Sequence, residues 1–175
     1  MERCWLTSLS IVKYPHESLL SRCENVDAFG PDVSTLISDM VETMYASGGI
    51  GLAAPQVGAL RNIVVIDSSG GEDRSGLMIM VNPLITWTSP EQCVMGEGCL
   101  SIPGVTVNVK RSVACDVTYL GDDKNTVSMR LTGLSARIVQ HEVDHLSGVL
   151  MIDKVGPLAR RTVLRELKEM NEGNV

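Results

Sequence analysis

The pattern His141-Glu142-Val143-Asp144-His145 constrains this chain more than any other feature of its sequence. It lies in the segment Leu134–Leu146, which has the apolar spacing of a helix. Residues four apart on a helix are about 40° apart in projection, so both imidazoles can reach one cation from the same face. Glu142 flanks that pair, close enough to act on a water molecule beside the cation. The pattern therefore indicates metal-assisted hydrolysis, and it requires a fold that encloses one face of this helix.

The alternative is a pair of histidines on a solvated helix face, capped or salt-bridged and without a metal. The chain has only 3 histidines, and two of them occupy this pattern. A chance match in a sequence so poor in histidine is improbable. We therefore favour the metal site over the solvated pair.

Two histidines leave a catalytic site short of a third protein ligand. The metzincin spacing would place a third histidine at position 151, where this chain has Met151. A thermolysin-like carboxylate could come only from the end of the chain, in a helix folded beside the histidines; the candidates are Glu166, Glu169 and Glu172. Cys99 is the better candidate, because it stands between Gly98 and a tight polar turn, although a lone cysteine is more often a small buried apolar residue. One cysteine and two histidines would hold a divalent cation tetrahedrally and leave the fourth position for water.

Short strands are predicted through the middle of the chain. They are rich in Val, Ile and Thr and are bounded by turn residues: Arg61–Asp67, Leu77–Asn82, Val105–Arg111, Val113–Leu120 and Thr126–Thr132. The polar loops Ser68–Arg74 and Gly121–Lys124 join consecutive strands and are short enough for hairpins. We therefore expect mainly antiparallel sheets.

Three helices accompany these strands. The first spans Asp32–Ser47, with Asp32 as its cap and Gly48-Gly49 at its end. The second carries the histidine pattern; the predicted cap is Thr132 or Gly133 and the stop is Gly148. The third follows Pro157 and runs to about residue 172. The prediction is an α+β fold: mainly antiparallel sheets around a central helix that carries the His-Glu-x-x-His motif, with an N-terminal and a C-terminal helix.

The composition narrows the classes of partner. The 175 residues suit a single catalytic domain over residues 1–175, and the net charge of −6 disfavours nucleic acid. The apolar runs are far shorter than the roughly 18 residues of a membrane span, and the first residues lack a secretory signal pattern. The 5 cysteines form no paired framework, as in a reducing compartment. We expect a cytoplasmic monomer that contacts no membrane.

Three motifs together resemble the signatures of peptide deformylases, in the same order along the chain. They are Gly49-Ile50-Gly51-Leu52-Ala53-Ala54-Pro55-Gln56, Glu97-Gly98-Cys99-Leu100-Ser101 and Gln140-His141-Glu142-Val143-Asp144-His145. The glycine-rich motif alone would be weak evidence, since it lacks the Gly-Lys-Ser/Thr ending of a phosphate loop. The resemblance extends from about Ile11 to Pro157. It implies removal of the N-formyl group from the initiator methionine of new polypeptides, with release of formate.

The resemblance also implies roles for individual residues. The metal ligands would be Cys99, His141 and His145, and the metal is commonly Fe(II), with Zn, Ni or Co able to replace it. Glu142 would move the proton of the attacking water. Gln56, through its side-chain amide, and Leu100, through its backbone N–H, would stabilise the oxyanion.

Substrate contacts follow from the same resemblance. Gly49 and Gly51 would let an extended substrate backbone approach closely, although they could equally serve to end the first helix. The pocket for the methionine side chain would be lined by Ile50, Met95, Leu134 and Ile138, each of which could instead be a core residue. Glu97 and Arg111 resemble an ion pair that steadies the cysteine segment; the alternative is a solvated pair of little energetic value. Arg137 and Asp144 flank the histidine helix and would orient it or line the cleft.

The residues are also compatible with two competing functions, and the terminal helix suggests the ribosome as a further partner. A zinc endopeptidase would use the same helix with an acidic ligand from the chain end, and a binding module would keep the shape without the activity. The terminal helix of bacterial relatives is associated with ribosome docking, whereas a solvated helix face explains its charges as well. The sequence leaves a bacterial, phage or organellar origin open.

Overall fold

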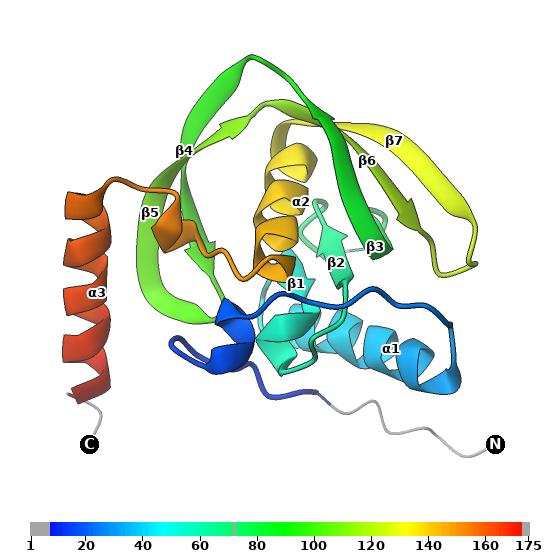
Figure 1. Ribbon diagram of the computed structural model, residues 1–175, viewed down its shortest axis with the longest axis horizontal. Coiled ribbons are helices and arrows are strands. Elements are labelled where there is room, and N and C mark those ends of the chain that lie inside the picture. The colour runs from blue at the N-terminus through cyan, green and yellow to red at the C-terminus, as the bar shows by residue number, and fades with distance from the viewer. Residues whose placement is uncertain (1–7, 72, 173–175) are drawn as a thin grey trace.

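The computed structural model describes residues 8–71 and 73–172 of the chain (Figure 1). The elements are, in order, α1 (Pro31–Ala46), β1 (Gly51–Ala53), β2 (Ile63–Asp67), β3 (Leu77–Thr88), β4 (Gln92–Cys99), β5 (Ile102–Ser112), β6 (Ala114–Leu120), β7 (Thr126–Thr132), α2 (Gly133–Leu146) and α3 (Pro157–Glu172), with short 3-10 helices at Glu17–Leu20, Ala54–Val57 and Met151–Asp153. The prediction that no secretory signal opens the chain concerns residues that lie mostly outside this described part. None of the described helices has the length and apolar character needed to cross a membrane.

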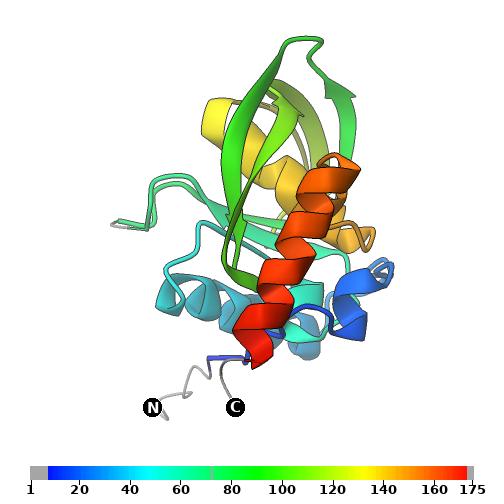
Figure 2. The ribbon, with the colours of Figure 1, turned by 90° about the vertical axis from the view of Figure 1, so that its left-hand side faces the viewer.

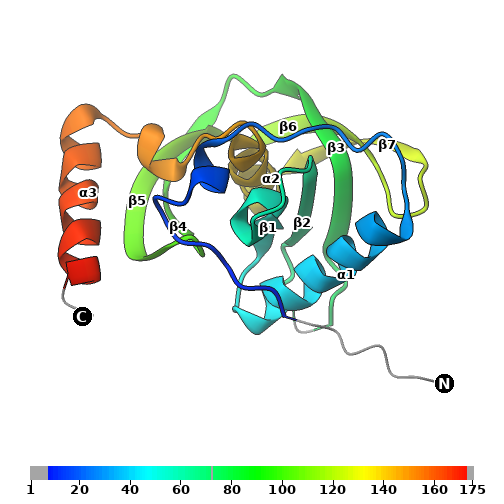
Figure 3. The same ribbon diagram turned by 60° about the horizontal axis from the view of Figure 1, so that its bottom comes forward.

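The strands form two antiparallel sheets with α2 between them. The larger sheet has the order β1-β2-β3-β6-β7, and the smaller is the hairpin of β4 and β5. Figure 3 shows α2 almost along its axis, with β4 and β5 on one side and β2 and β3 on the other. The predicted α+β architecture with mainly antiparallel sheets around this helix is therefore confirmed.

Strand β2 is buried on both faces, which explains its continuous run of apolar residues. Val64 and Ile66 belong to the apolar cluster between the sheet and α2. Ile63 and Val65, which point the opposite way, belong to the cluster beneath α1. The two helices thus cover opposite faces of the larger sheet, and α2 is fixed against it from the inner side.

Helix α2 is buried on two faces of different chemistry. Ala136, Val139 and Leu146 pack into the apolar cluster of the larger sheet. His141 and His145 are buried as well, at 9% and 1% exposure, but do not belong to that cluster. The fold therefore encloses polar side chains of α2 on the side of the β4–β5 hairpin.

Helix α3 packs on the outer side of the β4–β5 hairpin (Figure 2). Its buried residues Val163 and Leu167 join a third apolar cluster with Val105, Val107 and Val109 of β5. The hairpin separates α3 from α2 (Figure 1). The alternative of a thermolysin-like glutamate ligand from α3 is therefore wrong for Glu166 and Glu169, which lie on the far side of the hairpin from the histidines. The side chain of Glu172 lies outside the described part of the structure.

Several predicted boundaries need correction. Strand β3 continues past Asn82 to Thr88, because Pro83 falls at a bulge between β3 and β6, where no ladder donor is required. Strand β4 was not predicted, since its exposed side chains leave no burial pattern and only its backbone pairing with β5 defines it. The cap of α1 is Gly30 rather than Asp32, which lies in the first turn.

Candidate active site

Three metal-ligating side chains converge where the end of β4 meets α2. The ligand atoms of Cys99, His141 and His145 all lie within 4.8 Å of one another. Cys99 Sγ is 3.3 Å from His145 Nε2. The two imidazoles come from successive turns of α2, as the four-residue spacing predicts. Cys99 comes from 42 positions before His141, and it is half-buried rather than exposed.

His141 is held by a carboxylate from the neighbouring sheet. Its Nδ1 donates to Glu97 Oε2 at 3.0 Å, which leaves Nε2 as the nitrogen available to a cation. Arg111 also binds Glu97, through Nε (2.7 Å) and Nη2 (2.9 Å), and Arg137 Nη1 donates to Glu97 Oε1 at 2.5 Å. Arg111 Nη1 reaches Asp144 at 2.8 Å. Glu97 and Arg111 thus form the expected ion pair within a buried network of two arginines that orients His141, and the alternative of a solvated pair is wrong.

Burial and neighbouring groups shift the pKa values of Glu97, His141 and His145. Burial raises the pKa of Glu97, but hydrogen bonds from His141 and Arg111 outweigh it and lower that pKa to about 2. For His141, burial lowers the pKa, while contacts with Cys99 and Glu97 raise it to about 10. Burial and the positive charge of His141 lower the pKa of His145 to about 3. The two imidazoles are thus driven in opposite directions: Glu97 favours the protonated form of His141, and burial favours the neutral form of His145.

Glu142 lies beside the donors in a buried position. Burial raises the pKa of its carboxyl to about 7, against the opposing effect of the positive charge of His141. Among the described residues, Oε2 of Glu142 has no hydrogen-bond partner. A Cβ built on Gly51 would lie 2.9 Å from Cδ of Glu142, closer than real Cβ atoms approach. The absent side chain at Gly51 therefore makes room for this carboxylate. As predicted, α1 is terminated by Gly48, whose φ is +66°, and by Gly49, whose backbone N–H donates to the Met44 carbonyl at 2.9 Å.

Gln56 faces the same site from the 3-10 helix that follows β1. Its Oε1 accepts a hydrogen bond from the Ala53 backbone at 2.8 Å. Its Nε2 lies 3.5 Å from Cys99 Sγ and 3.4 Å from Ser101 Oγ. Because Oε1 is anchored on the Ala53 backbone, the amide turns its N–H groups towards Cys99 and Ser101. Leu100, the other expected oxyanion donor, follows Cys99 directly in the turn between β4 and β5.

A cavity of about 620 Å³ opens onto these groups, large enough for one amino-acid side chain and part of a peptide. Its lining includes all the residues expected to contact substrate: Gly49, Ile50, Gly51, Met95, Leu134 and Ile138. Ile50, Met95 and Leu134 are more than one-third exposed, and Ile138 is buried. The first three therefore lie at the mouth of the cavity, and Ile138 lies deeper.

One contributor to the site was given no role from the sequence: Ser101 is fully buried beside Gln56. Arg137, expected to orient the histidine helix or to line the cleft, donates to Glu97, to the Val109 carbonyl and to the Cys93 carbonyl, and it also lines the cavity. Arg137 precedes His141 by four residues on α2, so helical spacing could have placed it on the same face. Nothing local in the sequence marks the carbonyls that it binds.

The donor set fits a divalent metal ion. A thiolate and two imidazoles are the ligand types that bind Zn²⁺ and other first-row ions with an open position. The ligand atoms of His141 and Cys99 are within reach of a common point, and beside them Oε2 of the buried Glu142 carboxylate has no hydrogen-bond partner in the described part of the chain. Fold and site together define a metal-dependent hydrolase with an enclosed pocket beside its metal centre.

Comparison with known proteins agrees with this class. A family model described as Polypeptide deformylase matches residues 8–161. The peptide deformylase of Thermodesulfovibrio yellowstonii is 43% identical over 160 residues, covering 91% of this chain and 96% of the relative. That of Chromohalobacter salexigens is 38% identical over 164 residues, covering 94% and 95%. The crystal structure of a peptide deformylase from Legionella pneumophila superposes with a TM-score of 0.89 at 34% identity, covering 96% of this chain and 98% of that one.

The chain therefore belongs to the peptide deformylase family. It is a metal-dependent hydrolase that removes the N-formyl group from nascent formylated peptides. The alternatives of an endopeptidase and of a non-catalytic binding module are set aside by this membership.

Proposed function

We propose that Cys99, His141 and His145 are the ligands of the metal and that the native ion is Fe(II). The observation that carries this proposal is the convergence of the three ligand atoms within 4.8 Å beside buried Glu142. When bound, a divalent cation supplies Lewis acidity at the formyl oxygen and lowers the pKa of water in its coordination shell. The same donors bind Co, Ni or Zn at least as strongly as Fe(II) in the usual order of affinities, so these ions can replace it.

Glu142 moves the proton in this proposal. Its carboxylate accepts a proton from the attacking water and returns it to the amine nitrogen that leaves with the peptide. Its raised pKa of about 7 supports this role, because a group with a pKa near the working pH can both accept and release a proton. The missing side chain of Gly51 leaves the space that this carboxylate occupies.

Gln56 and Leu100 stabilise the oxyanion that develops on the formyl oxygen when water attacks the formyl carbon. The Nε2 amide of Gln56 is oriented by the hydrogen bond that its Oε1 accepts from Ala53. The backbone N–H of Leu100 donates to the same oxyanion from the turn between β4 and β5. Such donors are typically worth roughly 3 to 4 kcal/mol each to the transition state.

The cavity takes the methionine side chain, and the segment Gly49–Gly51, which leads into the edge strand β1, takes the peptide backbone. Ile138 and the apolar parts of Ile50, Met95 and Leu134 supply the contacts for an unbranched thioether. Glu97 and Arg111 act through His141 and the cysteine segment, which they hold in place.

Other expectations stay predictions. They are a single catalytic domain over residues 1–175, a monomeric state, a cytoplasmic location and docking of α3 on the ribosome. On α3, Arg160 lies 3.2 Å from Asp153 and Arg165 lies 4.0 Å from Glu169. These local pairs support the alternative of a solvated helix face over ribosome docking.

The test is formate release from a formyl-methionyl peptide by anaerobically prepared, Fe-loaded protein. We expect turnover by the wild type and almost none by Glu142→Ala. Metal analysis of protein purified without oxygen would identify the native ion. No formate from the Fe-loaded wild type would overturn the proposed function.

A further inference from the structure

The turn that joins β4 to β5 carries Leu100, and its geometry is unusual for a hairpin. Strand β4 ends at Cys99, β5 begins at Ile102, and these two residues are paired, so Leu100 and Ser101 form a two-residue loop. The turns favoured in such loops, types I′ and II′, need a positive φ at the first central residue. Within the described chain, Leu100 and Ser101 have no positive φ. The twist of the flanking strands therefore does not by itself favour this turn.

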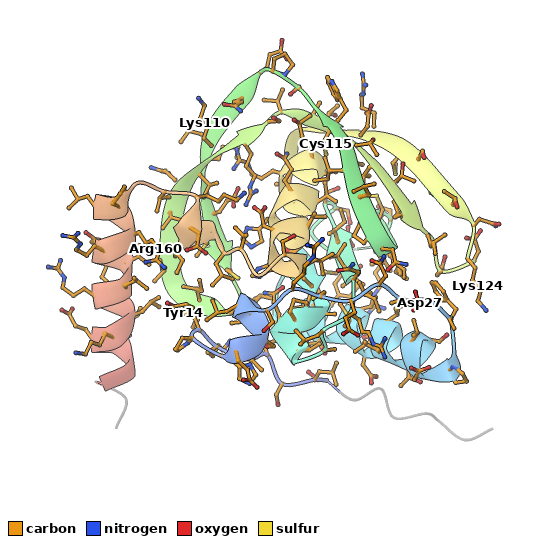
Figure 4. All side chains as sticks on the ribbon, in the orientation of Figure 1. Tyr14, Asp27, Lys110, Cys115, Lys124 and Arg160 are labelled. Atoms are coloured by element: carbon orange, nitrogen blue, oxygen red, sulfur yellow. The ribbon has the colours of Figure 1, made fainter. Side chains whose placement is uncertain are left out.

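The loop is held from outside by two consecutive residues near the N-terminus. Lys13 Nζ donates to the Leu100 carbonyl at 2.7 Å, and the Tyr14 backbone N–H donates to the Ser101 carbonyl at 3.0 Å. Both central carbonyls of the turn thus have partners from one short segment. Figure 4 labels Tyr14 beside the lower end of the β4–β5 hairpin.

The same segment also holds the other oxyanion donor. The Val12 backbone N–H donates to the Gln56 carbonyl at 2.9 Å. Ser18, which is 4% exposed, donates through Oγ to the Pro55 carbonyl at 2.8 Å. Residues 12–18 therefore bind both chain segments that face the reacting carbonyl, whereas Gln56 itself reaches the cysteine turn only through contacts of 3.4 and 3.5 Å.

We propose that residues 12–18 form a clasp that sets the distance between the two oxyanion donors, and that Lys13 is its positioning residue. The inference rests on the proposed roles of Gln56 and Leu100. Lys13 is not proposed to touch substrate or metal. It fixes the Leu100 carbonyl, and in this way it sets the orientation of Leu100 and the direction of its backbone N–H. Donors to a developing charge act only when they are held in place beforehand, and a displacement of about 1 Å can cost a hundredfold in rate.

Lys13 is the member of the clasp that substitution can test, because the other contacts to the turn come from the backbone. Its side chain is exposed, so its loss should leave the fold intact. In Lys13→Met the apolar stem remains and only the donor is removed; Lys13→Arg restores a donor of similar reach. The matched control is Lys110→Met, an exposed lysine labelled near the upper end of the hairpin in Figure 4.

We expect Lys13→Met to lower kcat for a formyl-methionyl peptide at least about tenfold. The expected KM, Tm and metal content are those of the wild type, because substrate and metal ligands are untouched. Lys13→Arg should recover most of kcat, and Lys110→Met should match the wild type. Unchanged kcat in Lys13→Met, or a loss of kcat that only parallels losses of Tm and metal, would overturn the proposal.

A second measurement is independent of turnover. In Zn-loaded protein, NMR signals of the Leu100 amide and of the Gln56 side-chain amide should shift in Lys13→Met and return towards their original positions in Lys13→Arg. If both signals stay unchanged in Lys13→Met, the proposed role of residues 12–18 is wrong, whatever the activity of the variant. A wild type without formate release would instead overturn the proposed function, and the NMR comparison would still decide for or against the clasp.

Discussion

Gly51 and Glu142 occupy adjoining space that admits no side chain at position 51. A Cβ on Gly51 would lie 2.8 Å from Ile138 Cγ2 and 2.9 Å from Glu142 Cδ. Gly51 has no positive φ, so the backbone conformation does not require glycine here. The requirement comes from the buried carboxylate on α2.

Substitution Gly51→Ala should therefore displace Glu142 or Ile138 and lower kcat/KM by about a hundredfold. Formate release measures this effect. The matched control is Gly156→Ala, where an added Cβ would meet nothing within 4 Å. Equal activity of Gly51→Ala and the wild type would show that the site tolerates a methyl group at this position.

Replacing Glu142 by glutamine keeps the shape of the side chain and removes its ability to carry the proton. We expect Glu142→Gln to lower kcat by about 10²- to 10⁴-fold, the usual contribution of a positioned acid–base group. Metal content should remain that of the wild type, because the three ligand atoms are elsewhere. Glu166→Gln on α3 is the control and should be fully active. Substantial turnover by Glu142→Gln would assign the proton transfer to another group.

Arg111→Met tests the buried network around Glu97. The side chain of Arg111 is 5% exposed and binds both Glu97 and Asp144, so its removal leaves buried carboxylates short of a partner. The expected loss in the free energy of unfolding is about 3 to 5 kcal/mol, measured by urea denaturation. Arg130→Met removes an arginine bound in the same way to Asp116, but at the surface, and should change stability little. Similar effects of the two substitutions would contradict the importance of burial.

Removal of the cysteine ligand should empty the metal site. We expect Cys99→Ala to purify with little metal and without deformylase activity, since two histidines alone bind divalent ions weakly. Cys93→Ala, which changes an exposed thiol on the same strand, should keep both. Metal analysis of anaerobically purified proteins makes the comparison. Full metal content in Cys99→Ala would require a different third ligand.

Asp67 makes part of the stability depend on pH. Burial raises the pKa of this carboxyl, but hydrogen bonds from Ser69 and Tyr45 outweigh it, so the pKa is lowered overall. The unfolded chain then binds a proton more readily than the folded one, and stability present above about pH 4 is lost as the pH falls further. Asp67→Asn should therefore show a shallower decline in the free energy of unfolding between about pH 5 and pH 3. Asp27→Asn, at an exposed position, is the control and should follow the wild type.

Local patterns in the sequence were sufficient for most secondary structure and for the central helix of the site. The positions of His141, Glu142 and His145 follow from helical spacing alone, because the backbone of one helix fixes their relative directions. Strand β4 was missed for the converse reason. It is defined by hydrogen bonds to β5 and leaves no alternation of buried side chains.

The amino-acid sequence alone is enough to predict the metal-binding helix, the alternation of strands and turns and, through three motifs, the family with Cys99 as the expected third ligand. The packing of the whole chain is needed to bring Cys99 to the histidines, to let Arg111 and Arg137 share Glu97, and to place Lys13 on Leu100. The residues that these contacts join are separated in the sequence by 14 to 87 positions. No local periodicity encodes them, because they depend on how whole sheets and helices pack against one another.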